Sequence, residues 1–153
     1  MWIQRRPAEL EVLELNSPNP DQINLIVADM EASVAFYRRL GLDIPDTDPA
    51  WQGHHRSAQG AGGLDFDLDS DEFARHWNRG WAGGRAVIGF KVESRPRVDE
   101  LHAELTDAGY RSQQDPYDAF WGARYAVVED PDGNPVGIMS PVDPARRSDP
   151  GFP

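Results

Sequence analysis

The sequence predicts an α+β domain in which two tandem βαβββ modules form a curved mixed sheet around a cleft. The prediction depends on an internal repeat and on the alternation of apolar residues within its strands. A strand-like run at 22–27 leads into a helix-like segment that ends at Gly41. A second such run at 87–92 leads into a helix-like segment that ends at Gly109. The shared order of strand, helix and glycine indicates that one unit occurs twice.

The first module is expected to span residues 21–84. Its predicted elements are a strand at 22–27, a helix at 30–40, and strands at 42–44, 51–59 and 64–68. Val34, Tyr37 and Leu40 fall at helical spacing, and the glycine that follows is the residue that most readily ends a helix.

The second module is expected to span residues 85–140. Its predicted elements are a strand at 87–92, a helix at 96–108, and strands at 110–113, 124–128 and 136–140. Pro96 lies where a helix can begin. The run Asp130–Asn134 contains the Asp-Gly pair that a tight hairpin requires, so it predicts a turn between the last two strands.

The segments that flank the modules differ from them in composition. Residues 1–20 are expected to form an N-terminal leader or arm, which ends in a run of Asn, Ser and Pro. Residues 141–153 are rich in Pro, Arg and Asp and offer almost nothing to bury, so they are predicted to be a disordered tail.

Strand alternation predicts which side chains pack on the helices and which face the cleft. The expected helix-facing residues are Ile23, Leu25, Val27, Ile88, Phe90, Val92, Val136 and Ile138. The expected cleft-facing residues are Gln22, Asn24, Ile26, Val87, Gly89, Lys91, Gly137 and Met139. Asp65 and Asp67 alternate with apolar neighbours, so they either line the cleft or form a solvated strand face.

Composition narrows the classes of function. The 26 acidic residues exceed the 15 basic ones and give a net charge of −11, which disfavours a nucleic-acid partner. The acidity either keeps the chain soluble or attracts a cationic small molecule. The chain has no cysteine, which removes disulfides and thiolate chemistry. It also lacks an apolar run long enough for a signal peptide or a membrane span, so a cytoplasmic location is expected.

Several short motifs together resemble the vicinal oxygen chelate superfamily, which includes glyoxalase I, extradiol dioxygenases and bleomycin-resistance proteins. The opening of that fold resembles the run 26–29 with Ser33, Phe36, Tyr37 and the Leu-Gly-Leu at 40–42. Its closing hairpin resembles Trp121-Gly122 followed by Asp130–Asn134. The resemblance covers about residues 21–140 and implies the two-module fold.

The resemblance also implies where a metal would be held, with one ligand on the first strand and one on the last strand of each module. Those positions correspond to Gln22, Asp67 (or Asp65), Val87 and Gly137. Valine and glycine have no donor atom in their side chains, so at most two ligands remain. The sequence therefore predicts neither a metal nor another cofactor.

The residues predicted to bind a small molecule combine aromatic rings with charged and amide groups. They are Asn24, Trp51, His55, Asp65, Asp67, Lys91, Phe120, Trp121, Arg124 and Met139. Alternatives accompany several of them: His55 is either a cavity residue or an exposed strand residue, and Lys91 and Arg124 either reach the cavity or pair with carboxylates. Trp77 and Trp81 are expected to share one helix face. Asp69 is expected to begin a helical turn.

The leading hypothesis is a metal-free small-molecule binding protein similar to the bleomycin-resistance branch, which sequesters a cationic or planar compound. The resemblance implies a homodimer with clefts between subunits. The first alternative is a glyoxalase-like lyase or dioxygenase with an atypical metal site. The others are a metal-free isomerase or hydrolase and an accessory protein for a biosynthetic intermediate.

Overall fold

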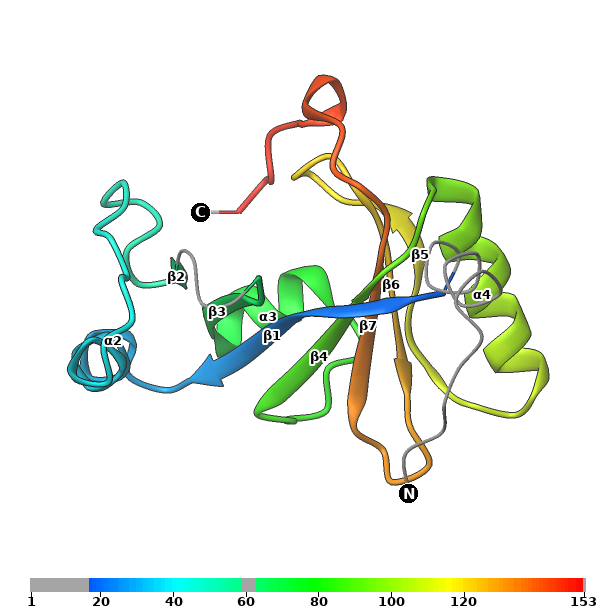
Figure 1. Cartoon of the computed structure of the whole chain (residues 1–153), viewed down its shortest axis with the longest axis horizontal. Helices are drawn as coiled ribbons and strands as arrows, with labels where there is room; N and C mark the ends of the chain where they lie inside the picture. Colours follow the sequence, from blue (N-terminus) through cyan, green and yellow to red (C-terminus); the bar gives the residue numbers. More distant parts are fainter. Residues whose placement is uncertain (1–16, 59–62, 153) are drawn as a thin grey trace, which may run out of the picture.

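The computed structural model describes residues 17–58 and 63–152. Its strands are β1 Asn19–Val27, β2 His55–Ala58, β3 Asp65–Ser70, β4 Ala86–Lys91, β5 Ser112–Asp118, β6 Arg124–Glu129 and β7 Pro135–Met139. They form one seven-stranded mixed sheet in the order β2-β3-β1-β4-β7-β6-β5 (Figure 1). The predicted α+β class is therefore confirmed. Most of the predicted leader lies outside the described residues, although β1 begins within it at Asn19.

The two modules lie side by side in this sheet because β1 and β4 pair with each other. That central pairing is antiparallel, whereas β1 pairs with β3 and β4 pairs with β7 in parallel. The repeat is less regular than predicted. Residues 42–44 form only an isolated bridge at Asp43, so the first module lacks the counterpart of β5. The short strand β2 is consequently one edge of the sheet, and β5 is the other.

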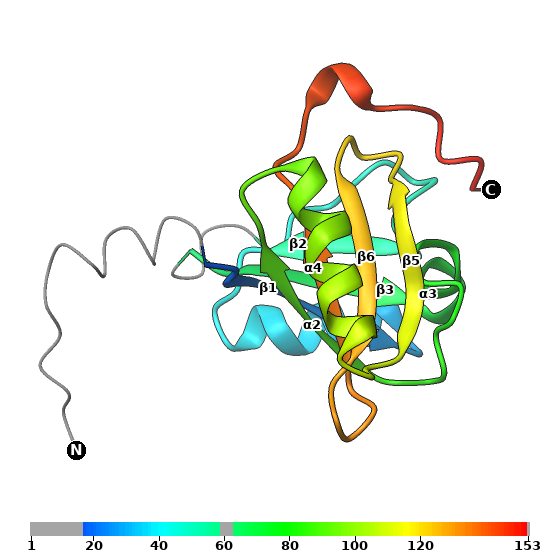
Figure 2. The same ribbon diagram turned by 90° about the vertical axis from the view of Figure 1, so that its right-hand side faces the viewer.

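Helices α2 (Met30–Arg39) and α4 (Arg95–Asp107) cover the same face of the sheet, one over each module, and α4 runs alongside β6 in Figure 2. Each begins at a side chain that accepts a hydrogen bond from a backbone N–H, Asp29 for α2 and Ser94 for α4. Helix α3 (Asp71–Trp77) packs on the opposite face. It ends at Trp77, so the prediction that Trp77 and Trp81 share one helix face is wrong.

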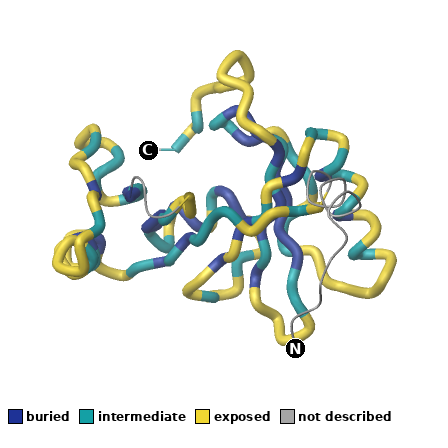
Figure 3. The backbone as a smooth tube through the Cα atoms, in the orientation of Figure 1, coloured by how far each residue is buried: buried dark blue, intermediate teal, exposed yellow. Residues whose placement is uncertain are grey.

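The core is divided among three clusters of buried residues from the strands and the inner faces of the helices. Figure 3 shows that much of the buried backbone lies along the strands. Leu25 and Val27 pack under α2, and Val92 and Ile138 pack under α4, as alternation predicts. Ile88 was expected to pack in the same way, but it is 49% exposed. Among the described residues, α2 packs mainly on β3 and α4 packs mainly on β5, β6 and β7, so neither helix packs closely on the middle of β4.

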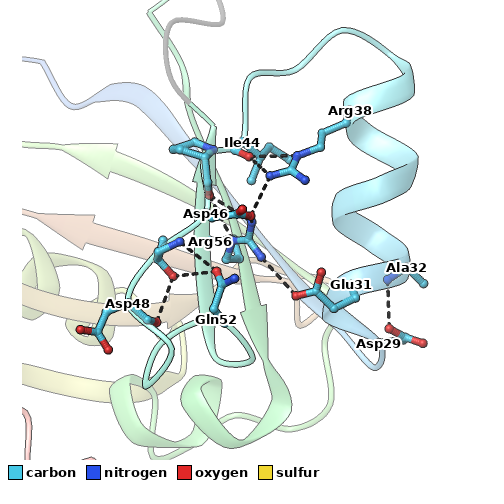
Figure 4. A network of polar contacts seen from close by, with 11 residues as sticks. Asp29, Glu31, Ala32, Arg38, Ile44, Asp46, Asp48, Gln52 and Arg56 are labelled. Atoms are coloured by element: carbon cyan, nitrogen blue, oxygen red, sulfur yellow. Dashed lines mark hydrogen bonds and ion pairs between the residues drawn. The ribbon is translucent and has the colours of Figure 1, made fainter.

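The loop that replaces the missing strand is held by a buried arginine (Figure 4). Arg56 in β2 is 0% exposed, and its guanidinium donates to the carbonyl of Pro45 and to the carboxylates of Asp46 (3.0 Å) and Glu31 (3.3 Å). A buried guanidinium is tolerated only when its donors are satisfied, so this group ties loop 41–50 to β2 and α2.

The C-terminal segment departs from its predicted disorder. Residues 141–152 carry a short 3-10 helix at Pro144–Arg146, and they turn back over the molecule from the end of β7 in Figure 1. The N–H of Asp143 donates to the carbonyl of Gly122, and the N–H of Ser148 donates to the carbonyl of Phe120. These backbone hydrogen bonds to the loop before β6 order a segment that has few apolar residues of its own.

In the part of the chain that the structure describes, no helix meets the length and hydropathy of a membrane span.

Replacing the buried guanidinium tests its role in holding the loop. We expect Arg56→Met to lower the free energy of urea unfolding by about 2–3 kcal/mol, because the carbonyl of Pro45 loses its donors. Arg85→Met is the matched control: Arg85 pairs with Asp71 on the surface, and its loss should cost about 0.5 kcal/mol or less. Equal losses in the two variants would contradict the anchoring role.

Candidate functional site

A cavity of about 310 Å³ opens on the face of the sheet opposite α2 and α4. It is lined by Gln22, Asn24, Trp51, His55, Asp65, Asp67, Asp69, Phe73, Trp77, Phe120, Trp121, Tyr125 and Met139. Both modules contribute to this lining within one chain. The volume is at the lower end of the range for small-molecule sites.

Six side chains of the first module, five of which line the cavity, form a closed ring of hydrogen bonds, here called the polar ring. Its members are Gln22, Asn24, Asp69, His55, Ser57 and Asp67. They come from β1, β2 and β3, whose parallel and antiparallel registers place Asn24 beside Asp67, and Ser57 on the other side of Asp67. The sheet register therefore builds the ring.

The amide half of the ring consists of Gln22 and Asn24. Nε2 of Gln22 donates to Oδ1 of Asn24 (2.8 Å) and to Oδ2 of Asp67 (3.1 Å). Nδ2 of Asn24 donates to Oδ2 of Asp69 (2.8 Å). The amides thus connect two carboxylates, of which Asp69 is 0% exposed and Asp67 is 8% exposed.

The other half of the ring passes through His55. Its Nδ1 lies 2.6 Å from Oδ1 of Asp69, and its Nε2 lies 3.2 Å from Oγ of Ser57, which donates to Oδ1 of Asp67 (2.5 Å). Ser57 has only one hydrogen, which it gives to Asp67, so it accepts from His55. Both imidazole nitrogens then carry hydrogens, which makes His55 a cation between two carboxylates.

The pKa values agree with this protonation pattern. Burial lowers the pKa of His55, but the hydrogen bond and charge of Asp69, together with the charge of Asp67, outweigh burial and raise it. Burial raises the pKa of Asp67 to about 6, against the lowering effect of the His55 charge and the Ser57 hydrogen bond. Asp67 is therefore a carboxyl group whose charge changes in mildly acidic solution.

The second module gives the cavity an apolar half. Gly89 and Gly137 are neighbours on β4 and β7, and each leaves space that a side chain from another strand fills. A Cβ on Gly89 would lie 3.0 Å from Cβ of Gln22, and a Cβ on Gly137 would lie 2.7 Å from the hydroxyl of Tyr125. Val87 is fully buried beside them.

These contacts test whether the site fits the metal that the resemblance implies. Val87 and Gly137 offer no donor, and the ring of Tyr125 fills the space that a side chain at 137 would need. Both oxygens of Asp67 already accept hydrogen bonds from Ser57 and Gln22. Across residues 17–58 and 63–152, no three His, Asp or Glu side chains form a group that could hold a metal ion. The residues at the implied positions do not fit a metal.

Aromatic rings from both modules form the remaining walls. Trp51, in the loop before β2, stacks on Phe120, in the loop before β6, with centroids 6.0 Å apart and planes at 21°. Trp121 meets Tyr125 edge to face at 5.4 Å, and its Nε1 donates to the sulfur of Met139 at 3.3 Å. The Trp51–Phe120 stack connects the two modules at the cavity.

The C-terminal segment adds one more ring to this wall. Phe152 stacks on Trp51 with centroids 6.0 Å apart, and it contacts His54, Phe73 and His76 edge to face. The segment therefore runs from the Phe120 loop of the second module to the Trp51 loop of the first.

Most of the residues predicted to bind a ligand lie together in the lining. Asn24, Trp51, His55, Asp65, Asp67, Phe120, Trp121 and Met139 all do. Lys91 and Arg124 do not. Lys91 is exposed near the end of β4, and Arg124 points to the α4 side, where it pairs with Asp99 (2.7 Å) and Asp118 (3.3 Å). Arg124 precedes Tyr125 on β6, so alternation places it on the opposite face.

Sequence reasoning missed four lining residues: Asp69, Phe73, Trp77 and Tyr125. Asp69 was expected to begin a helical turn, but it continues β3, which ends at Ser70. Its alternation with Asp65 and Asp67 was the available signal. For Phe73 and Trp77 the signal was their spacing of four on a helix.

Comparison with known proteins settles the family. The model of the Glyoxalase/Bleomycin resistance protein/Dioxygenase superfamily matches residues 19–138. The chain belongs to this superfamily. No curated protein matches it.

Solved structures share the fold of this superfamily member at low identity. A Legionella pneumophila structure described as an NAD-dependent benzaldehyde dehydrogenase is 21% identical, with a TM-score of 0.60, and the match covers 79% of this chain and 98% of that one. A superfamily member from Vibrio splendidus 12B01 is 13% identical, with a TM-score of 0.56 and coverages of 82% and 100%. A Mn(II)-bound glyoxalase from Novosphingobium aromaticivorans is 20% identical, with a TM-score of 0.54 and coverages of 88% and 42%. At such identities the likeness concerns the fold alone.

The raised pKa of His55 predicts a pH dependence of stability. Its contribution is fully present below the pKa of an unfolded histidine, about 6.5, and is lost as pH rises through the higher folded value. We expect the free energy of urea unfolding to fall between pH 7 and pH 8.5, a window above the pKa of about 6 of the neighbouring Asp67. In His55→Gln this fall should largely disappear, whereas the adjacent control His54→Gln should keep it. An unchanged fall in His55→Gln would contradict the cationic assignment.

The contacts of Phe152 predict that it shields Trp51. We expect Phe152→Ala to raise the acrylamide quenching of tryptophan fluorescence, since one face of Trp51 loses its cover. In a Trp51→Phe background the same substitution should change the quenching little, which separates this ring from the other tryptophans. Equal increases in the two backgrounds would show that Phe152 acts elsewhere.

Proposed function

We propose that the protein is a metal-free small-molecule binding protein of the bleomycin-resistance type, which sequesters a compound with a flat apolar part and a positive charge. The observation that carries the proposal is the composition of the cavity lining. Asp65, Asp67 and Asp69 lie among aromatic rings, and neither Lys nor Arg is among the lining residues. Three carboxylates against one cationic His55 leave a negative cavity that favours cations.

The aromatic walls supply the second part of the recognition. Trp51, Phe120 and Trp121 present aromatic surface to the cavity, and Met139 adds a polarisable surface. The polar ring is closed on itself, so its side chains are held in fixed positions before a ligand arrives. A preorganised site loses less entropy on binding.

A second candidate is a metal-dependent lyase or dioxygenase with an atypical site. Its support is the superfamily, in which the similar Novosphingobium glyoxalase is bound to Mn(II). The mismatch at Val87 and Gly137 weighs against it. Metal content of untagged protein, measured by mass spectrometry, separates the two candidates: one equivalent per chain favours the enzyme.

The binding proposal is tested with a matched pair of flat probes. The cation 9-aminoacridine should raise the melting temperature in a dose-dependent manner at about pH 7.5, because a ligand that binds only the native state stabilises it. Acridine has nearly the same shape but is neutral at that pH, so it should raise the melting temperature much less. Equal shifts, or no shift with either probe, would overturn the proposal.

Removing one charge tests the role of Asp67. We expect Asp67→Asn to weaken 9-aminoacridine binding about tenfold, as measured by isothermal titration calorimetry. Lys91→Met is the control, because it changes the net charge by the same amount in the opposite direction, at a residue outside the lining. Similar effects of opposite sign in the two variants would indicate that only the overall charge matters.

A further inference from the structure

The polar ring leaves its carboxylates charged but already engaged by hydrogen bonds. Oδ1 and Oδ2 of Asp67 accept from Ser57 and Gln22, and Oδ1 and Oδ2 of Asp69 accept from His55 and Asn24. Each of the four oxygens therefore has a donor within the protein. Since both carboxylates are almost fully buried, a ligand has little room to approach them as a further donor.

This arrangement affects two kinds of cation differently. A primary ammonium is strongly hydrated and carries three N–H donors, each of which needs an acceptor when it leaves water. An ammonium whose hydrogens are replaced by methyl groups keeps its charge and has no donors to satisfy. It gains from a negative field without requiring a free oxygen.

The other walls suit the second kind of cation. Trp51 and Phe120 stack on each other, and Trp121 and Tyr125 meet edge to face on the apolar side of the cavity. Aromatic faces attract cations through their quadrupoles and also bury methyl groups, which makes such surfaces good receptors for alkylated ammonium groups. Among the lining carboxylates, Asp65 is exposed at the rim and adds charge rather than a buried acceptor.

We propose that the cavity selects a quaternary ammonium over a primary amine. This inference rests on the proposed function, because it names the class of cation that the same site takes. Selectivity has two sources. The carboxylate oxygens of the polar ring already accept hydrogen bonds within the protein, and the aromatic walls attract a cation that has no donors.

The test compares benzylamine with benzyltrimethylammonium by isothermal titration calorimetry at about pH 7.5, where both are cations with the same aromatic ring. We expect the trimethylated probe to bind at least about tenfold more tightly. Equal affinities, or tighter binding of benzylamine, would overturn the inference and leave the proposed function standing if 9-aminoacridine still binds. If no cation binds, 9-aminoacridine included, both fail.

Ser57→Ala separates the two sources of selectivity. If hydrophobic contacts alone caused the preference for benzyltrimethylammonium, this substitution would leave the ratio of the two affinities unchanged. Removing the hydroxyl frees Oδ1 of Asp67 as an acceptor. The affinity for benzylamine should then rise relative to that for benzyltrimethylammonium, and the ratio should fall about threefold. Trp81→Leu is the control: it removes a tryptophan that is not part of the lining and should leave the ratio unchanged. An unchanged ratio in Ser57→Ala would contradict the role of the saturated ring.

Discussion

The antiparallel pairing of β1 with β4 is the constraint on which the site depends. It sets Asn24 opposite Val87 and Gln22 opposite Gly89, so the cleft faces of the two modules become one surface. The parallel neighbours then add Asp67 beside Asn24 and Gly137 beside Gly89. The floor of the cavity is therefore fixed by main-chain hydrogen bonds, and only its side chains distinguish one half from the other.

That distinction is pronounced. Equivalent positions of the two modules carry donors and acceptors on one side, and glycine or valine on the other. Each glycine leaves space for a neighbour, so Gln22 lies over Gly89 and Tyr125 lies over Gly137. A superfamily fold with two similar halves thus holds a cavity with one polar wall and one apolar wall, which suits a molecule whose two ends differ in the same way.

The sequence predicted the sheet and both long helices because their patterns are local: apolar alternation in 22–27 and 87–92, and helical spacing before Gly41 and Gly109. It also predicted that Asn24 faces the cleft, whereas it left Asp65 and Asp67 open between the cleft and a solvated strand face; all three line the cavity. It did not predict the polar ring, because its contacts join residues up to 45 positions apart, as Gln22 and Asp67 are. Nor did composition reveal the order of residues 141–152, which depends on backbone hydrogen bonds to Gly122 and Phe120.

The missing strand of the first module determines how the sheet can meet other chains. It leaves β2, only four residues long, as one edge, and exposed edges of greater length are the usual templates for strand addition. The other edge, β5, is interrupted by two irregularities in register and contains Pro116, which has no N–H to donate. Within residues 17–58 and 63–152, neither edge offers a long run of free backbone groups. A second chain that paired with the described part of either edge would therefore gain few main-chain hydrogen bonds.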